Sequence, residues 1–138
     1  LSCDLMCGLP EQSLEDLRES VERLLEFPLN HVSCYLLTLP QHHPMYAQLP
    51  DEETQFAHLL AIHDLLAARG FERYEVSNFC KPGFRSQHNM NYWTGGSYLG
   101  FGPSAHSFDA EARVRWKNVS SLHRWAQGVQ SGVGAREG

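Results

Sequence analysis

The order of apolar patterns along the chain is the feature that most constrains its fold. Residues 1–8, 31–39 and 71–77 are predicted to be strands, and residues 14–25 and 51–70 between them carry apolar side chains at helical spacing. Each connection exceeds the dozen residues that a parallel crossover needs. The pattern therefore predicts repeated βαβ units and an α/β fold whose sheet is parallel or mostly parallel.

Local signals mark the ends of these helices. Ser13 followed by Asp16 is typical of a capping box, so Ser13 is predicted to begin the first helix. Asp51 is predicted to cap the second helix and Gly70 to end it. A further helix is predicted over residues 119–130.

The carboxyl ends of the predicted strands are where a ligand is expected. In parallel α/β sheets these ends meet at one edge, which selects residues 4–8, 35–40 and 77–80. Three strands make only part of a barrel or sheet and would leave a long exposed edge, which proteins avoid. We therefore expect further strands ahead of residue 1.

Composition excludes several classes of protein. The net charge is -5 and no basic run occurs, which argues against broad nucleic-acid binding because phosphate contacts need clustered Lys and Arg. No apolar run approaches the ~20 residues of a membrane span, and no signal or transit peptide is visible at Leu1. The four cysteines do not follow a disulfide-scaffold pattern and favour a reduced, intracellular protein.

Cys3 and Cys7 raise the question of an iron–sulfur site. Their C-x3-C spacing begins the cluster loop of radical enzymes that use S-adenosylmethionine (SAM). Such a loop needs a third cysteine three positions later, where this chain has Pro10. We therefore expect two small residues on one face of a buried strand, and no metal ligand in this chain.

Residues 86–107 combine side chains in a way that favours a binding site. His88, Asn89, Tyr92 and Trp93 offer fixed hydrogen-bond directions or flat aromatic faces. Four nearby glycines allow the backbone to approach a ligand closely, and His106 follows them.

Several segments together resemble one known family, the oxygen-independent coproporphyrinogen III oxidase-like radical SAM proteins, and within it the HemW, haem-chaperone-like branch. The resemblance rests on DLMCGLPEQS at 4–13, HVSCYLLT at 31–38, YEVSNF at 74–79, H-N-x-x-Y-W at 88–93 and G-x-G-x-x-A-H-S at 100–107. It implies the C-terminal half of a radical SAM partial (β/α) barrel with mostly parallel strands, truncated at both ends. Residues 1–110 would form this part of the barrel, and residues 111–138 would begin a linker or helical C-terminal region.

The resemblance implies three SAM contacts. Asp4 matches the carboxylate that contacts SAM in the family, and its alternative role is that of a capping or turn residue. Thr38 falls where the family places a small residue beside the adenine or methionyl part, and its alternative is an ordinary residue at a strand end. His106 matches a position whose backbone contacts the adenine.

The H-N-x-x-Y-W segment is open to two interpretations. His88, Asn89, Tyr92 and Trp93 would line the substrate or haem side of the barrel mouth, because aromatic faces suit a flat macrocycle and histidine binds haem iron. Alternatively, these residues pin a long loop over the barrel by hydrogen bonds and stacking.

Two functions follow from the resemblance. The favoured one is haem binding and delivery to haem-acceptor proteins by a protein that uses SAM and a [4Fe–4S] cluster. The alternative is oxidative decarboxylation of porphyrinogen propionates by an oxygen-independent coproporphyrinogen III oxidase. The expected location is the cytoplasm, or the mitochondrion in a eukaryote. Because the family's cluster cysteines are absent from this sequence, we expect the chain alone to be inactive in radical chemistry.

Overall fold

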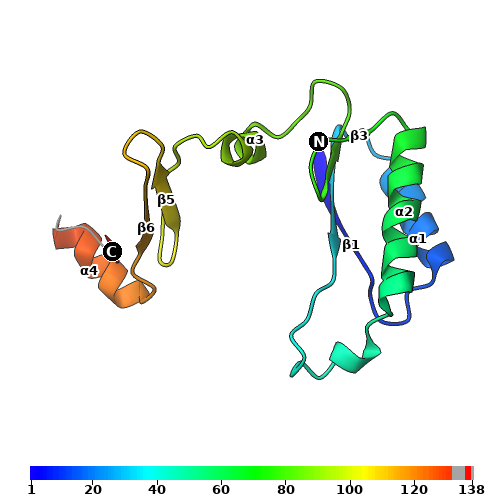
Figure 1. The fold of residues 1–138 in the computed structure, drawn as a ribbon, viewed down its shortest axis with the longest axis horizontal. Coiled ribbons are helices and arrows are strands. Elements are labelled where there is room, and N and C mark those ends of the chain that lie inside the picture. The colour runs from blue at the N-terminus through cyan, green and yellow to red at the C-terminus, as the bar shows by residue number, and fades with distance from the viewer. Residues whose placement is uncertain (132–135, 138) are drawn as a thin grey trace. The chain divides into compact units, whose positions relative to one another are not determined.

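The computed structural model describes residues 1–131, 136 and 137, and divides the chain into two compact units (Figure 1). Unit 1 comprises Leu1–Ser86 and unit 2 comprises Gln87–Gly138. Each unit is therefore described by itself. The predicted boundary at residue 110 stays a prediction, and the end of the predicted C-terminal region, residues 132–135 and 138, lies outside the described residues.

Unit 1 is a four-stranded sheet with two long helices. In chain order its elements are β1 (Ser2–Cys7), α1 (Leu14–Leu24), β2 (His31–Leu36), the 3-10 helix η1 (Tyr46–Gln48), α2 (Glu52–Ala68), β3 (Glu72–Arg73) and β4 (Asn78–Cys80). The strand order in the sheet is β1-β2-β4-β3. The predicted α/β class is confirmed.

The capping signals in the sequence mark both helix starts correctly. The Ser13 hydroxyl accepts a hydrogen bond from the Asp16 N–H (3.1 Å), and the Asp16 carboxylate accepts one from the Ser13 N–H (3.0 Å). Asp51 accepts from the Thr54 N–H (2.8 Å) at the start of α2. Gly70 follows the C-cap of α2 with a φ of +79°, a conformation that glycine adopts at little cost.

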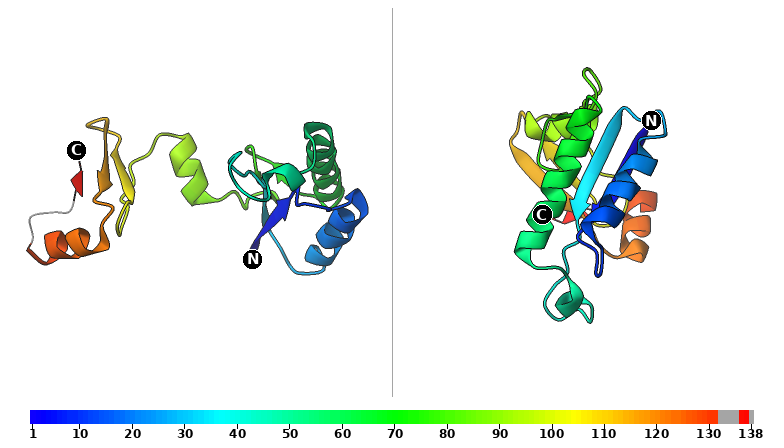
Figure 2. Two further views of the ribbon diagram at one scale, coloured as in Figure 1. Left: turned by 90° about the horizontal axis from the view of Figure 1, so that it is seen from below. Right: turned by 90° about the vertical axis from the view of Figure 1, so that its right-hand side faces the viewer.

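Both helices cover the same face of the unit 1 sheet (Figures 1 and 2). Side chains alternate between the two faces of a strand, so every second residue of β1 and β2 points to the helices. Burying a leucine or isoleucine fully contributes about 1.5–3 kcal/mol. The core of unit 1 contains Leu17 and Val21 from α1, Ile62 and Leu66 from α2, and Val32, Cys34 and Phe79 from the sheet.

The prediction of a mostly parallel sheet is wrong for this chain. β1 and β2 pair in parallel, but β4 runs antiparallel to both β2 and β3. The predicted strand at 71–77 is instead a short hairpin, because residues 74–77 turn back before β4 begins. As a result Cys80 lies opposite His31, at the start of β2, and so away from the edge where the sequence pattern expected it.

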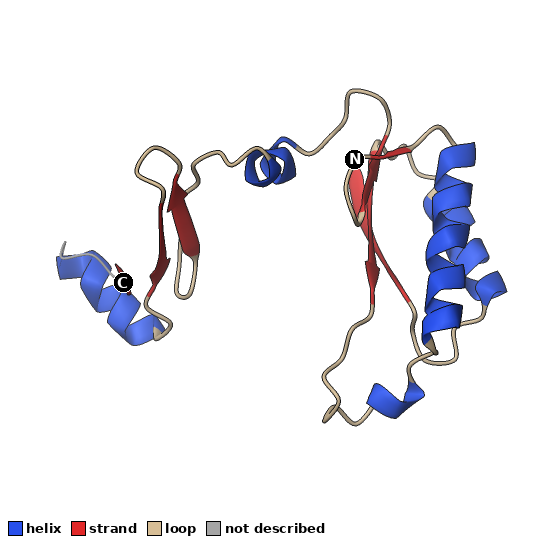
Figure 3. Ribbon diagram, in the orientation of Figure 1, coloured by secondary structure: helices blue, strands red, loops and turns tan. Residues whose placement is uncertain are grey.

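The described part of unit 2 contains two helices and an antiparallel sheet of strand order β5-β6-β7, in which β5 and β6 form a hairpin (Figure 3). Its elements are α3 (Gln87–Trp93), β5 (His106–Asp109), β6 (Val114–Asn118), α4 (Leu122–Ser131) and β7 (Arg136–Glu137). The helix predicted over 119–130 is present as α4, whereas α3 and the hairpin are additional to the predicted elements. Among the described residues no helix is long and apolar enough to cross a membrane.

Candidate functional site

The sheet face of unit 1 that the helices do not cover carries a row of polar side chains. Strand register places Asp4 opposite Ser33, and Ser33 opposite Asn78, so these three residues form a row across three strands. Neighbouring strands lie ~4.8 Å apart. We call this surface the open sheet face. It includes the row of Asp4, Ser33 and Asn78 and the adjacent His31 and Ser2.

Asp4 lies in the middle of β1, and the expectation that it ends the strand is wrong. It is an exposed residue between the partly buried Cys3 and Leu5, which point to the opposite face. Its carboxylate is therefore accessible on the open sheet face, where it can accept hydrogen bonds from hydroxyl or ammonium groups.

His31 is the centre of a hydrogen-bond chain on the same face. The Nδ1 atom lies 3.1 Å from the Ser2 hydroxyl, and the Nε2 atom lies 2.8 Å from the Tyr74 hydroxyl. The Tyr74 hydroxyl also accepts from the Ser86 N–H (3.3 Å). Burial lowers the pKa of His31, although the charges of Asp4 and Glu75 oppose this shift. The chain ties β1, β2 and the loop after β4 together around an imidazole that favours its neutral form.

A tight turn between β3 and β4 borders the open sheet face. The Glu75 carboxylate accepts hydrogen bonds from the Ser77 N–H (3.0 Å) and from the Asn78 amide group. Arg73 donates to the carbonyl oxygens of Glu75 (3.1 Å) and Val76 (2.8 Å). The amide oxygen of Asn78 is buried and has no hydrogen-bond partner among the described residues.

Thr38 has different surroundings from Asp4. It is exposed two residues beyond β2, and its hydroxyl donates to the Leu36 carbonyl oxygen (3.4 Å). It lines a cavity of about 430 Å³ together with Tyr46 from η1 and with Asp51 and Gln55 near the start of α2. The strand-end position predicted for Thr38 shifts by two residues because β2 ends at Leu36.

The glycine-rich segment of unit 2 is held in one conformation. The Gly100 N–H donates to the Ser107 hydroxyl (3.0 Å), and the Asn118 amide donates to the carbonyl oxygens of Gly100 (3.2 Å) and Gly102 (2.9 Å). A Cβ atom at Gly100 would collide with the carbonyl oxygen of His106. The backbone of Gly100 thus approaches that of His106 closely, while the His106 residue itself is exposed at the start of β5.

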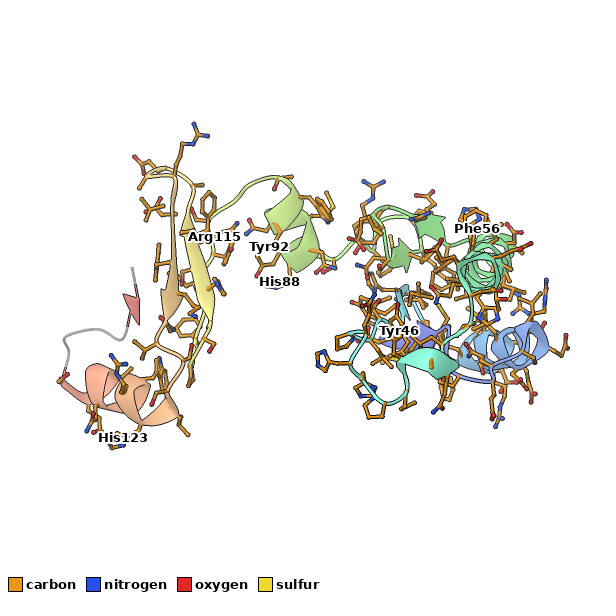
Figure 4. The ribbon with its side chains drawn as sticks, turned by 60° about the horizontal axis from the view of Figure 1, so that its bottom comes forward. Tyr46, Phe56, His88, Tyr92, Arg115 and His123 are labelled. Atoms are coloured by element: carbon orange, nitrogen blue, oxygen red, sulfur yellow. The ribbon has the colours of Figure 1, made fainter. Side chains whose placement is uncertain are left out.

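His88 and Tyr92 belong to a row of aromatic rings in unit 2. The His88 and Tyr92 rings are 4.9 Å apart, the Tyr92 and Tyr98 rings 4.6 Å, and the Tyr98 and Phe108 rings 6.1 Å. Figure 4 shows Tyr92 between α3 and the hairpin of β5 and β6. We call His88, Tyr92, Tyr98 and Phe108 the aromatic row.

The other residues of the H-N-x-x-Y-W segment differ in exposure. Trp93 is 61% exposed, and Asn89 is partly buried. The neighbouring Asn91 donates to the Ser97 carbonyl oxygen (3.1 Å) and so fastens α3 to the segment that follows. The segment therefore both holds a loop in place and presents aromatic side chains at the surface.

The four cysteines lie in unit 1 as free thiols. Cys7, Cys34 and Cys80 are buried, and burial raises the pKa of each, that of Cys34 to about 12. Cys3 and Cys7 lie in β1, so their prediction as strand residues is confirmed. Within residues 1–131, 136 and 137, no group of three or more His, Cys, Asp or Glu could hold a metal ion.

Several residues of these sites escaped the sequence interpretation. His31, Tyr74 and Asn118 carry the hydrogen-bond networks, and Tyr98 and Phe108 extend the aromatic row. The role of His31 could have been suspected, because a histidine within the mostly apolar segment 31–39 needs a hydrogen-bond partner when it is buried. The other contacts depend on pairing between distant segments.

Comparisons with known proteins give a consistent result. No protein-family model matches the chain. It is similar to the haem chaperone HemW of Lactococcus lactis subsp. lactis, with 36% identity over 132 residues that cover 91% of this chain and 34% of the relative. HemW of Escherichia coli is 40% identical over 106 residues, covering 75% of this chain and 28% of the relative. The chain thus spans about one third of the length of these curated relatives.

A solved structure supports the fold. Coproporphyrinogen III oxidase (HemN) of Escherichia coli, described as a radical SAM enzyme, matches with a TM-score of 0.73 over 98% of this chain and 35% of that chain. The identity of 20% restricts this likeness to the fold. The sequence similarity confirms the resemblance described above: over the third of their length that it spans, the chain is similar to the HemW proteins.

Proposed function

We propose that the chain forms the C-terminal half of the partial barrel of a HemW-like protein that binds and delivers haem. In this proposal the open sheet face of unit 1 lines the barrel interior. The support is its chemistry: a carboxylate, a hydroxyl and an amide stand in one row on the face away from the helices. Asp4 is the exposed member of this row, so its carboxylate can meet a ligand.

SAM fits the open sheet face better than the cluster fits the cysteines. Asp4 would accept hydrogen bonds from the ribose or the ammonium group of SAM. A [4Fe–4S] cluster needs several cysteine thiolates gathered at one place, and the described residues hold no group of three or more His, Cys, Asp or Glu side chains that could bind a metal. The cysteines of this chain are therefore not cluster ligands in our proposal.

The aromatic row carries the haem-binding part of the proposal. It joins an exposed histidine, able to bind haem iron, to three further rings that can contact a flat macrocycle. His88 is the iron ligand in this scheme, and Tyr92 fixes its ring by an edge-to-face contact at 87°. Trp93 and Asn89 would lie at the rim of the same site.

Titration of the 138-residue chain with haem tests this function. We expect saturable binding with a shifted Soret band, which His88→Ala weakens. His123→Ala is the matched control, because His123 is an exposed histidine on α4, outside the aromatic row. Equal binding by the wild type and His88→Ala would reject His88 as ligand, and no saturable binding by the wild type would reject the function.

Asp4 is tested separately with SAM. Calorimetric titration should give weaker binding for Asp4→Asn than for the wild type, whereas Asp64→Asn, an exposed control on α2, should bind as the wild type does. Decarboxylation of porphyrinogen propionates, the alternative function, has only the fold likeness to HemN in its support. The cytoplasmic location and the haem-acceptor partners stay predictions.

A further inference from the structure

The aromatic row of unit 2 ends in a cation. The Arg115 guanidinium lies over the Phe108 ring, 5.7 Å from its centroid. Arg115 comes from β6, whereas His88 and Tyr92 at the other end come from α3 (Figure 4). Four aromatic side chains and one arginine are thus in continuous contact, although they come from four separate segments of the chain.

Strand register explains this arrangement. Tyr98 is bridged to Phe108, and Phe108 lies opposite Arg115 across the hairpin. Directly opposite residues of antiparallel strands point to the same face. The same register puts His106 opposite Lys117, so Tyr98, His106, Phe108, Arg115 and Lys117 share one face of the hairpin. This face combines aromatic and basic side chains, and the acidic Asp109 is out of phase with it.

The charge of Arg115 is available to a ligand. The residue is exposed, and among the side chains that the structure describes it forms a cation–π contact and no ion pair. The loop that brings Tyr98 to Phe108 is fixed by backbone hydrogen bonds of 2.9 Å in both directions. The guanidinium is therefore held beside the row, with its hydrogen-bond donors free to meet a carboxylate.

We propose that Arg115 binds a propionate carboxylate of haem while the rings of Tyr98 and Phe108 contact the edge of the macrocycle. This inference rests on the proposed haem-binding function and assigns the polar end of that site. An arginine fork binds a carboxylate through two parallel hydrogen bonds, and an aromatic ring beneath the guanidinium restricts its orientation. The ligand class is a flat tetrapyrrole with free carboxylates.

The experiment compares haem with haem dimethyl ester, in which the propionates are uncharged. Both ligands are titrated in the same detergent into the wild-type chain, Arg115→Gln and the control Arg124→Gln, which alters an exposed arginine on α4. For haem we expect Arg115→Gln to bind about two- to fivefold more weakly, as suits a partly exposed ion pair. The ester should bind all three proteins equally.

Three results would overturn the assignment. If Arg115→Gln binds haem as tightly as the wild type does, the guanidinium does not bind a propionate. An equal loss for haem and for the ester shows that Arg115 acts through packing. If the wild-type chain binds neither ligand, the proposed haem-binding function itself is rejected. This outcome differs from the first two, in which the wild type binds haem and only the role of Arg115 is rejected. Arg115→Lys, which keeps the charge without the fork, should lie between the wild type and Arg115→Gln for haem alone.

Discussion

His58 offers a sharp test of how unit 1 is stabilised. It lies on α2, is 1% exposed, and its Nδ1 atom forms no hydrogen bond among the described residues. Whichever tautomer is present, one polar ring atom is buried without a partner. We predict that His58→Leu stabilises unit 1, because leucine fills nearly the same volume without an unsatisfied polar atom.

The magnitude follows from the burial of this one atom. A buried polar group without a partner costs about 1–3 kcal/mol. The leucine side chain is slightly larger than that of histidine, and the strain of fitting it into the core offsets part of the gain. We therefore expect a net gain of about 1–2 kcal/mol in the free energy of unfolding. Unit 1 comprises residues 1–86, and for a domain of this size each kcal/mol raises the melting temperature by about 4–8 °C.

Thermal unfolding of the chain followed by circular dichroism measures this gain. His63→Leu is the matched control, since His63 lies on the same helix with its side chain 48% exposed. The two substitutions share the change in helix propensity, and the control should shift stability by less than ~0.5 kcal/mol. A melting temperature of His58→Leu at or below that of His63→Leu would refute the reasoning.

Three further predictions concern unit 1. Ser13→Ala should destabilise the chain by about 1 kcal/mol through loss of the capping box, measured by urea unfolding; an unchanged midpoint would contradict this. Because burial lowers the pKa of His31 from its usual 6.5, the unfolded chain takes up a proton first as the pH falls. The free energy of unfolding of the wild type should therefore fall below about pH 6.5, and that of His31→Gln should fall less. Melting temperatures of both proteins at several pH values measure this difference. An identical decline in both proteins would contradict the prediction. Burial raises the pKa of Cys34 to about 12, so iodoacetamide at about pH 8 should modify the partly exposed Cys3 well before Cys34. Mass spectrometry of the labelled peptides gives the order, and the reverse order would exclude this environment for Cys34.

The sequence predicts the starts of α1 and α2 well because their signals are local. Ser13 and Asp51 bond backbone groups three residues away. The apolar repeat marks the buried face of α1, whereas Phe56, Leu59 and Leu60 of α2 are exposed. The third strand could not be predicted in the same way. Residues 71–77 carry strand-forming side chains, but hydrogen bonds from Arg73 and to Glu75 fold them into a turn, which reverses the direction of the strand that follows.

The candidate sites were predictable as residue types and not as neighbours. His88 and Tyr92 are in contact because they lie four residues apart on α3, a helix that the sequence analysis did not predict. The contact of His31 with Tyr74 spans 43 positions and depends on how β3 and β4 return to β2. Likewise Arg115 meets Phe108 only through the register of the hairpin, which no local pattern specifies.

Because side chains alternate between the two faces of β1, substitutions at neighbouring positions of this strand should affect different properties: folding on one face and ligand binding on the other. Cys3, Leu5 and Cys7 contribute to the packed side of the sheet, so changes of volume there should reduce the amount of folded protein. Asp4, on the other side, can lose its charge without a change in packing. A scan of every substitution along this strand would therefore show abundance and ligand affinity responding at alternate positions, with a period of two residues.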